Sequence, residues 1–261
     1  MSREQNNELH IKNVSKTYPI EKGTLQVLDN INLDIKPGEF VSIVGSSGCG
    51  KSTLLKMMIG LENPTEGEIR IGERKVEKPS VDVGMVFQEA RLYPWLTIEK
   101  NLRFGIQKDV PKEEHEKMIR EHIELVGLKG FEKAYPAQLS GGMKQRASIA
   151  RALIGNPQVL LLDEPFGALD AFTRINMQNE VLRIWELEKR TMVLVTHDID
   201  EAIFLSDRIV ILSERPGKIK EIIPVNLPRP RDRSTNLFLE IRKRILTSFL
   251  GNSELNIEYY I

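Results

Sequence analysis

The chain has 261 residues, with 37 basic and 37 acidic side chains, so its formal net charge at pH 7 is zero. A hydrophobic content of 41% with 28% charged residues is ordinary for a globular protein and excludes a long disordered or fibrous chain. One cysteine excludes an internal disulfide, the balanced charge disfavours nucleic-acid binding, and no stretch has the roughly 18 to 20 apolar residues that span a bilayer. We therefore expect a cytoplasmic protein that does not bind nucleic acid.

Short apolar runs alternate with longer segments of helical spacing, which is typical of an α/β protein. We predict strands over residues 27–35, 40–44, 83–87, 159–162, 192–195, 208–212 and 218–223. We predict helices over residues 51–59, 171–187 and 199–205, and a longer helical stretch over residues 97–154. The longer stretch separates two predicted strands, so the pattern indicates an α/β core interrupted by a helical insertion.

A glycine-rich segment lies between the strand predicted over residues 40–44 and the helix that follows it. It has the form G-x-x-x-x-G-K-[ST] and consists of Gly45, Ser46, Ser47, Gly48, Cys49, Gly50, Lys51 and Ser52, with Thr53 next. Its glycines let backbone N–H groups surround phosphates, and the helix directs a partial positive charge at them. Lys51 would reach the terminal phosphates, and the Ser52 hydroxyl would bind Mg²⁺. Cys49 is either a neutral spacer in this loop or a redox-sensitive group.

Two carboxylates follow the apolar run over residues 159–162. Asp163 and Glu164 would then lie at the carboxyl edge of a buried parallel strand, where ligands bind in doubly wound sheets. Asp163 is suited to hold Mg²⁺ through a water molecule, and Glu164 could act as a base or orient water toward the γ-phosphate. A solvated strand end is the alternative, but together with the glycine-rich segment the pair predicts a P-loop nucleoside triphosphatase.

A second glycine-containing motif lies between these two sites. It consists of Leu139, Ser140, Gly141, Gly142, Met143, Lys144, Gln145 and Arg146. Ser140 is a good N-cap, and two glycines at a helix start form an anion-binding nest. Because one nucleotide cannot easily use two such nests, the second one would serve a nucleotide bound to another subunit.

This octet resembles the signature motif of ATP-binding cassette (ABC) ATPases, and the family's other motifs occur in the expected order. Tyr18 lies where the family stacks an aromatic ring on adenine, and Gln88 resembles the Q-loop glutamine. Residues 167–170 resemble the D-loop, and His197 resembles the switch histidine. The resemblance extends from residue 9 to about residue 223.

The resemblance implies a RecA-like P-loop core with an antiparallel β subdomain and an inserted α-helical signature subdomain. It assigns residues 1–228 to the ATPase domain, with the helical subdomain over about 92–158, and leaves residues 229–261 as a short basic C-terminal extension. It further implies that the chain binds ATP and Mg²⁺. The implied catalytic residues are Lys51, Gln88, Glu164 and His197, the metal-binding residues are Ser52, Gln88 and Asp163, and the residues that act across a homodimer are Ser140, Gly141 and Gly142.

The segment after Gln88 contains several large apolar side chains, namely Leu92, Tyr93, Trp95 and Leu96. They either pack in the core or form a patch for a partner. The segment resembles that of importers for nitrate, sulfonates or taurine, in which it leads to the groove that receives a helix of the membrane subunit. Residues 227–233 also resemble the ending of that subfamily. For their physical role we predict a solvated basic linker before an amphipathic helix packed on the core.

Together these features predict the ATP-hydrolysing subunit of an importer for small oxyanions such as nitrate, aliphatic sulfonates or taurine. The resemblance implies transmembrane permease subunits docked near residues 88–96, and a solute-binding protein that acts indirectly. The chain would then lie at the cytoplasmic face of the plasma (inner) membrane, held there by the permease. The alternatives are an exporter subunit and a non-transport ATPase associated with nucleic acid or ribosomes.

Overall fold

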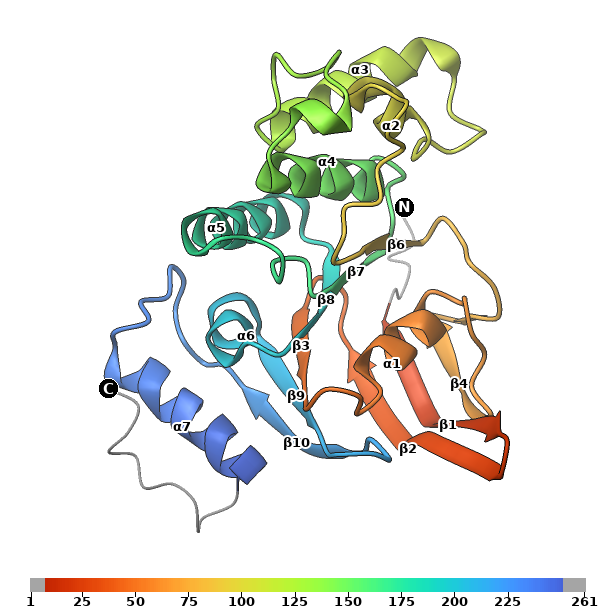
Figure 1. The fold of residues 1–261 in the computed structure, drawn as a ribbon, viewed down its shortest axis with the longest axis vertical. Helices are drawn as coiled ribbons and strands as arrows, with labels where there is room; N and C mark the ends of the chain where they lie inside the picture. The colour runs from red at the N-terminus through yellow and green to blue at the C-terminus, as the bar shows by residue number, and fades with distance from the viewer. Residues whose placement is uncertain (1–7, 251–261) are drawn as a thin grey trace, which may run out of the picture.

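The structure, a computed structural model, describes residues 8–250 and contains two β-sheets (Figure 1). The four-stranded antiparallel sheet has the order β2-β1-β4-β5 and contains β1 (Leu9–Ile20), β2 (Gly23–Ile35), β4 (Glu66–Ile71) and β5 (Arg74–Lys75). The six-stranded sheet has the order β10-β9-β3-β8-β7-β6 and contains β3 (Phe40–Val44), β6 (Val83–Val86), β7 (Val159–Asp163), β8 (Thr191–Thr196), β9 (Arg208–Leu212) and β10 (Ile219–Pro224). The helices are α1 (Lys51–Met58), α2 (Ile98–Arg103), α3 (Lys112–Leu125), α4 (Gly141–Leu153), α5 (Ala171–Glu188), α6 (Ile199–Leu205) and α7 (Asn236–Leu250), with a 3₁₀ turn at Pro136–Gln138.

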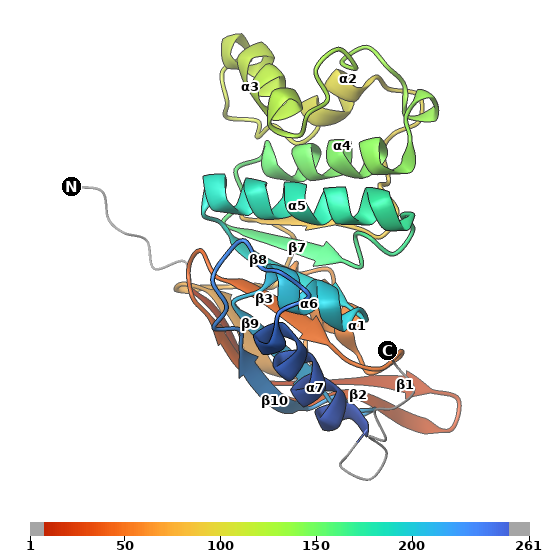
Figure 2. The ribbon, with the colours of Figure 1, turned by 90° about the vertical axis from the view of Figure 1, so that its left-hand side faces the viewer.

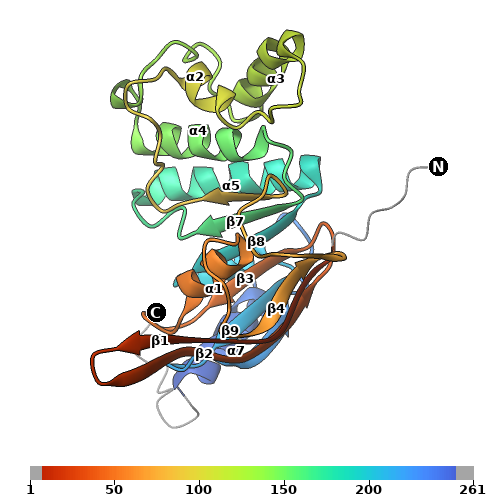
Figure 3. The same ribbon diagram turned by 90° about the vertical axis from the view of Figure 1, so that its right-hand side faces the viewer.

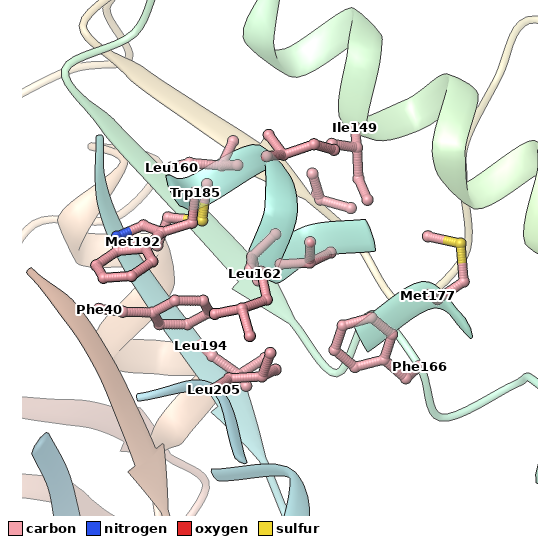
Figure 4. Close-up of a cluster of buried hydrophobic side chains, with 14 of the residues drawn as sticks. Phe40, Ile149, Leu160, Leu162, Phe166, Met177, Trp185, Met192, Leu194 and Leu205 are labelled. Carbon is pink, nitrogen blue, oxygen red and sulfur yellow. The ribbon is translucent and has the colours of Figure 1, made fainter. Parts of the chain in front are cut away.

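The six-stranded sheet is parallel except for β10, which pairs antiparallel with β9. β3 and β8 are buried at every position, as expected for apolar parallel strands covered on both faces. Alternate residues of one strand enter different cores: Val41 packs with α1 and the antiparallel sheet, whereas Phe40 packs with α5 and α6. Figure 4 shows the second of these cores, with Phe40 beside Leu162 and Leu194. The sheet is therefore fixed from both sides.

The helical insertion lies between β6 and β7 and contains α2, α3 and α4, at the top of Figure 1. Its spacing is confirmed in α3, where Ile119 and Ile123 are buried on one face, with Val126 just beyond the helix end. α5 lies between α4 and the sheet (Figures 2 and 3). The predicted α/β class with an antiparallel sheet and a helical insertion is thus confirmed, while the bounds 92–158, 1–228 and 229–261 stay predictions.

Three strands of the antiparallel sheet were not indicated by the sequence pattern: β1, β4 and β5. The pairing of β1 with β2 shifts register between Ile11 and Val14 and twice more before Thr17. Such irregularities break the alternation of apolar and polar residues on which strand prediction depends. In β4, only Ile69 and Ile71 are buried, so its apolar signal is short.

The prediction of a solvated linker over residues 227–233 is wrong. Arg231 is only 6% exposed, and its guanidinium donates hydrogen bonds to the carbonyls of Ile203 at 2.6 Å and Ser206 at 2.7 Å. Burial, and to a smaller degree the charge of Arg229, lowers the pKa of Arg231 to about 10. In a solvated linker these arginines would be hydrated. Here Arg229 and Arg231 instead bind the backbone carbonyls at the C-terminal end of α6.

The amphipathic helix predicted after that segment is confirmed as α7. Its apolar side chains include Phe238, which is 1% exposed, and Ile245, which is fully buried. Both belong to the core that α5 and α6 share with the sheet. Within residues 8–250, no helix is both long and apolar enough to cross a membrane.

Candidate active site

A cavity of about 380 Å³ lies at the carboxyl edge of the six-stranded sheet. It brings the glycine-rich loop after β3 together with residues that follow β7 and β8. The lining residues are Ser47, Gly48, Gly50, Lys51, Ser52, Thr53, Glu164, His197 and Arg215. Four segments far apart in the sequence therefore meet where a doubly wound sheet binds its ligands.

The glycine-rich loop continues directly from the buried strand β3 into α1. Gly48 and Gly50 have positive φ angles of 76° and 109°, which only glycine adopts without strain. The Lys51 ammonium, 7% exposed, donates hydrogen bonds to the carbonyls of Gly45 at 2.7 Å and Ser46 at 2.9 Å. Lys51 is thus held inside the curve of the loop, where a phosphate group would meet its charge.

Asp163 ends β7 beside the first turn of α1. The Ser52 hydroxyl donates a hydrogen bond to a carboxylate oxygen of Asp163 at 3.3 Å. Burial raises the pKa of Asp163, and the neighbouring Glu164 carboxylate raises it further, against the hydrogen bond from Ser52. A cation at this position would offset the cost of burying that charge.

The donor set fits Mg²⁺, which prefers oxygen ligands and keeps several waters or phosphate oxygens in its shell. Ser52 and Asp163 supply two oxygen groups side by side. Within residues 8–250, no cluster of three or more histidine, cysteine or carboxylate side chains is built to hold a metal ion by itself. The site therefore suits a Mg²⁺ that arrives with a nucleotide.

Glu164 and His197 are in contact at the wall of the cavity. Nδ1 of His197 lies 3.2 Å from Oε2 of Glu164. Glu164 has a φ of 45°, in the left-handed region, and its backbone N–H bonds to the carbonyl of Val195 in β8. This backbone geometry turns the carboxylate out of the strand and toward the loop that holds Lys51. A carboxylate and an imidazole in contact can orient water and take up its proton.

Gln88 and Tyr18 lie outside the lining of this cavity. Gln88 is next to Gly167, where an added Cβ would come within 3.2 Å of the Gln88 amide nitrogen. The hydroxyl of Tyr18 bonds to Glu62 and to Thr53, and the Lys16 ammonium lies 4.9 Å from the centre of its ring. Burial is the main cause that raises the pKa of Tyr18, and the hydrogen bond to Glu62 raises it further. The roles predicted for both residues stay predictions.

The signature residues Ser140, Gly141 and Gly142 also lie away from the cavity. Ser140 caps α4, with its hydroxyl oxygen accepting the N–H of Met143 at 3.3 Å. A Cβ at Gly142 would lie 2.5 Å from a methyl group of Thr173 in α5, so a larger residue there would displace the Thr173 side chain. The signature residues therefore lie at the start of α4, away from the glycine-rich loop of the same chain.

Arg215 is a cavity residue that the sequence reasoning missed. It lies at the tip of the β9–β10 hairpin and donates hydrogen bonds from Nε and Nη2 to the carbonyl of Gly48, at 3.0 and 2.8 Å. Next to it, Gly217 exchanges backbone hydrogen bonds with β2, through Val27 and Asp29. The sequence predicts strands over residues 208–212 and 218–223, on either side of this tip. The basic residue between them was the available signal.

A second exposed surface follows β6, on the segment where a partner was predicted. Tyr93, Trp95 and Phe104 are 38%, 69% and 66% exposed, and we call them the aromatic patch. The Tyr93 ring lies 5.6 Å from that of Trp95 and 4.9 Å from that of Phe104, measured between centres. Beside them is a groove of about 450 Å³ lined in part by Phe87 and Arg151. Burial in the core therefore does not explain these aromatic residues.

The loop that carries Tyr93 and Trp95 is held by polar side chains of the helical insertion. Asn101, fully buried, accepts the N–H of Tyr93 at 2.8 Å and donates to the carbonyls of Leu96 and Thr97, both at 3.1 Å. In α4, Gln145 donates to the carbonyl of Phe87 at 3.1 Å, next to Gln88. Arg151, also in α4, donates to the carbonyl of Arg91 at 2.8 Å. The segment around Gln88 is thus tied to the insertion.

Comparison with known proteins gives consistent matches over nearly the whole chain. The family described as ABC transporter matches residues 28–167. The aliphatic sulfonates import ATP-binding protein of Bacillus cereus (strain ZK / E33L) is 54% identical over 92% of this chain and 94% of its own length. An uncharacterized ABC transporter ATP-binding protein of Methanocaldococcus jannaschii is 50% identical over 92% of this chain and 90% of its own length.

A solved structure matches the fold as well. It is the dimeric structure of a post-hydrolysis state of an ATP-binding cassette bound to ADP and phosphate. That cassette is 36% identical to this chain, covers 84% of it over its own full length, and superposes with a TM-score of 0.73.

Proposed function

Because this chain belongs to the ABC transporter family, we propose that it is the ATP-hydrolysing subunit of an importer for aliphatic sulfonates. The chain is an ATP-binding cassette and an ATPase. One observation carries the proposal: the phosphate-binding loop, Glu164 and His197 line one cavity, whereas the signature nest at Ser140 lies elsewhere on the same chain. Such a chain needs a second copy to complete each nucleotide site.

In this proposal the cavity binds the phosphates of ATP. The N–H groups of residues 45–50 and the Lys51 ammonium would surround the β- and γ-phosphates. Ser52 and Asp163 would hold the Mg²⁺ that accompanies them. That ion would supply positive charge against the phosphate oxygens. Most of the catalysis is then electrostatic positioning rather than covalent chemistry.

Glu164 would orient the water that attacks the γ-phosphate and accept its proton as the bond to the β-phosphate oxygen breaks. The products are ADP and inorganic phosphate. His197, 3.2 Å from the Glu164 carboxylate, would hold that carboxylate in place and face the γ-phosphate. Gln88 would join the metal site from its position beside Gly167 when the site closes. Tyr18 would stack on adenine at the entrance, next to Thr53.

The second copy would contribute Ser140, Gly141 and Gly142 to the γ-phosphate. The exposed start of α4 and the rule that a helix N-terminus with two glycines binds anions support this role. Two ATP molecules would then be shared between two chains, and binding would draw the chains together. Hydrolysis would release them, because the affinity for nucleotide differs between the closed and open states.

The permease subunits would dock on the aromatic patch and its groove. A movement of the permease would reach the nucleotide site through Gln145 and Arg151. These two side chains bind the backbone carbonyls of residues 87 and 91, on either side of Gln88. The patch has the large, clustered aromatic side chains that are enriched at protein interfaces. The permease would therefore hold this chain at the cytoplasmic face of the membrane. A solute-binding protein would deliver the sulfonate to the permease without contacting this chain.

Growth on a single sulfur source tests this proposal. Deleting the gene from its host should abolish growth on an alkanesulfonate and leave growth on sulfate unchanged. A plasmid with the wild-type gene should restore growth, and one with Glu164→Gln should not. Loss of growth only on taurine as the sulfur source, or only on nitrate as the nitrogen source, would instead assign one of those solutes. Unchanged growth on all three would contradict an import role.

A further inference from the structure

A buried carboxylate that the proposed mechanism does not use lies behind His197. Glu201, in the first turn of α6, is 3% exposed and accepts a hydrogen bond from the Gln178 amide of α5 at 2.9 Å. Gln178 is itself 2% exposed. Burial raises the pKa of Glu201, and hydrogen bonds from Thr196 and Gln178 oppose that rise. A charged group is costly to bury, so this position calls for an explanation.

Glu201 is tied on both sides to the turn that carries His197. The Thr196 hydroxyl, 2% exposed, bonds to the Glu201 carboxylate, and its oxygen accepts the N–H of Asp198 at 3.0 Å. The Asp198 carboxylate in turn accepts the backbone N–H of Glu201 at 3.0 Å. His197 lies between two residues that Glu201 holds, so the position of its ring depends on this closed set of hydrogen bonds.

A small polar cavity of about 40 Å³ connects this set to the catalytic pair. Glu164, His197, Asp198 and Glu201 line it together with Arg174 of α5. Arg174 donates to the carbonyl of Leu169 in the D-loop at 3.1 Å and lies 3.9 Å from the Asp198 carboxylate. Its Nε is buried without a hydrogen-bond partner among the described residues. Charged groups therefore surround the turn from α5 as well as from α6.

The C-terminal extension reaches the same set through Arg233. The guanidinium of Arg233 donates to the Gln178 amide oxygen and lies 4.7 Å from the centre of the Phe204 ring of α6. Gln178 thus accepts from the extension on one side and donates to Glu201 on the other. The contacts run without interruption from Arg233 through Gln178, Glu201 and Thr196 to the turn at His197.

We propose that Glu201 is a positioning residue for His197, and that Gln178 and Arg233 place this positioning under the control of the C-terminal extension. The proposal rests on the role of His197 in the proposed function. With Arg233 docked, Gln178 presents its amide N–H₂ to Glu201, and Glu201 fixes the turn. When the extension is displaced, Gln178 is free to rotate, the turn loosens, and the His197 ring loses its fixed distance to Glu164.

Two variants of the full-length chain test this link. Gln178→Met keeps the shape of the side chain but removes both hydrogen bonds, and Arg233→Ala removes only the outer one. We expect kcat for ATP hydrolysis to fall about tenfold in Gln178→Met and about threefold in Arg233→Ala, because a small misplacement at the reacting centre is costly. The KM for ATP should stay unchanged in both variants, and Arg233→Lys should restore kcat. The melting temperature should fall in Gln178→Met, because the buried Glu201 carboxylate loses a hydrogen-bond donor, and should stay unchanged in Arg233→Ala.

Arg244→Ala is the matched control. Arg244 is also an arginine of the extension and pairs with Glu221, but it does not contact Gln178. It should leave kcat unchanged. A fall in kcat of equal size in Arg244→Ala, or a fall in Arg233→Ala together with a lower melting temperature, would mean general loosening of the extension. Either result would overturn the proposal.

Hydrogen exchange gives a second readout that does not depend on activity. Peptides covering residues 194–203 should exchange several-fold faster in Gln178→Met and in Arg233→Ala than in the wild type or in Arg244→Ala. Unchanged exchange in both variants would overturn the proposed link, whatever the rate of ATP hydrolysis. A wild-type chain that hydrolyses no ATP would contradict the proposed function, while the exchange would still decide whether Arg233 holds the turn at His197.

Discussion

The nucleotide-binding edge of the sheet and the aromatic patch are both exposed, yet they are held in place by different means. At the edge, Asp163, Glu164 and His197 follow directly from β7 and β8, whose other residues are almost entirely buried. Packing on both faces of the sheet fixes the backbone from which they project. Tyr93 and Trp95 of the patch instead lie on a loop that side chains such as Asn101 and Arg151 hold by hydrogen bonds to its carbonyls.

This difference suits the two tasks that we propose for these surfaces. A catalytic group must keep its position within a fraction of an ångström, and the end of a buried strand moves little. A surface that passes motion from a partner must shift as a unit, and a loop tied to one helix can follow that helix. Variants at the edge should therefore change the chemistry, whereas variants in the patch should change partner binding and leave the chemistry intact.

The largest effect is expected for Glu164→Gln at the edge. The amide keeps the size of the side chain but cannot accept a proton from water, so ATP turnover should fall roughly a hundredfold or more. ATP binding should persist, and a closed dimer should accumulate in the presence of ATP. Steady-state phosphate release and size-exclusion chromatography measure the two outcomes. Glu240→Gln, an exposed position in α7, is the control, and normal turnover in Glu164→Gln would remove Glu164 from catalysis.

The second largest effect is expected for Trp95→Ala, which should weaken binding to the permease and leave ATP hydrolysis unchanged. Trp95 is 69% exposed, so its removal should not disturb the fold. Losing a central aromatic contact should weaken binding to the permease about thirtyfold. Co-purification and titration against permease in detergent measure this, together with the ATPase rate of the chain by itself, which should not change. Phe131→Ala, at another exposed aromatic residue of the insertion, is the matched control; equal binding by Trp95→Ala and the wild type would contradict docking on the patch.

Tyr18→Ala should weaken ATP binding about tenfold, because stacking of a base on an aromatic ring is lost. Tyr18→Phe separates stacking from hydrogen bonding: it keeps the ring but loses the hydroxyl contact to Glu62. We expect the Phe variant to bind ATP nearly as well as the wild type in a calorimetric titration. If it binds as weakly as Tyr18→Ala, the hydroxyl rather than the ring face holds the nucleotide site.

The smallest effect is expected for Arg215→Ala. Arg215 lines the nucleotide cavity but is exposed, and solvent screens the attraction between its charge and the phosphates. Its removal should weaken nucleotide binding about threefold, while Arg215→Lys should recover part of the loss. Lys218→Ala, in the same hairpin and paired with Asp29, should bind nucleotide like the wild type. Identical affinities for Arg215→Ala and Lys218→Ala would show that Arg215 acts only on the shape of the loop.

Prediction from the sequence was most accurate where local chemistry decides the structure. The glycines at positions 48 and 50 have positive φ angles as a phosphate loop requires, and Asp163 and Glu164 lie at a strand end as the apolar run before them predicted. The α/β class and the helical insertion followed from apolar periodicity. β1 was not recognised because irregular register removes the alternation in its sequence.

Prediction failed where a residue's environment comes from distant parts of the chain. Arg231 and Arg233 lie in a stretch rich in proline and arginine, which is typical of a hydrated linker. The carbonyls of α6 that bind Arg231, and the amide of Gln178 that binds Arg233, come from segments about 25 and 55 residues earlier, as the hydrogen bonds show. Nothing in the local pattern distinguishes such a buried arginine from an exposed one.

The sequence by itself determined the chemistry of this protein: a phosphate loop, a carboxylate pair, a signature nest and a histidine after an apolar strand, each defined by neighbouring residues. The tertiary structure decided which of these groups meet. It placed Glu164 and His197 in contact, added Arg215 to the cavity, left the aromatic patch exposed and docked the C-terminal extension behind the turn at His197. The reason is that a motif depends on short-range backbone geometry, whereas a contact depends on how segments far apart in the chain pack against a common core.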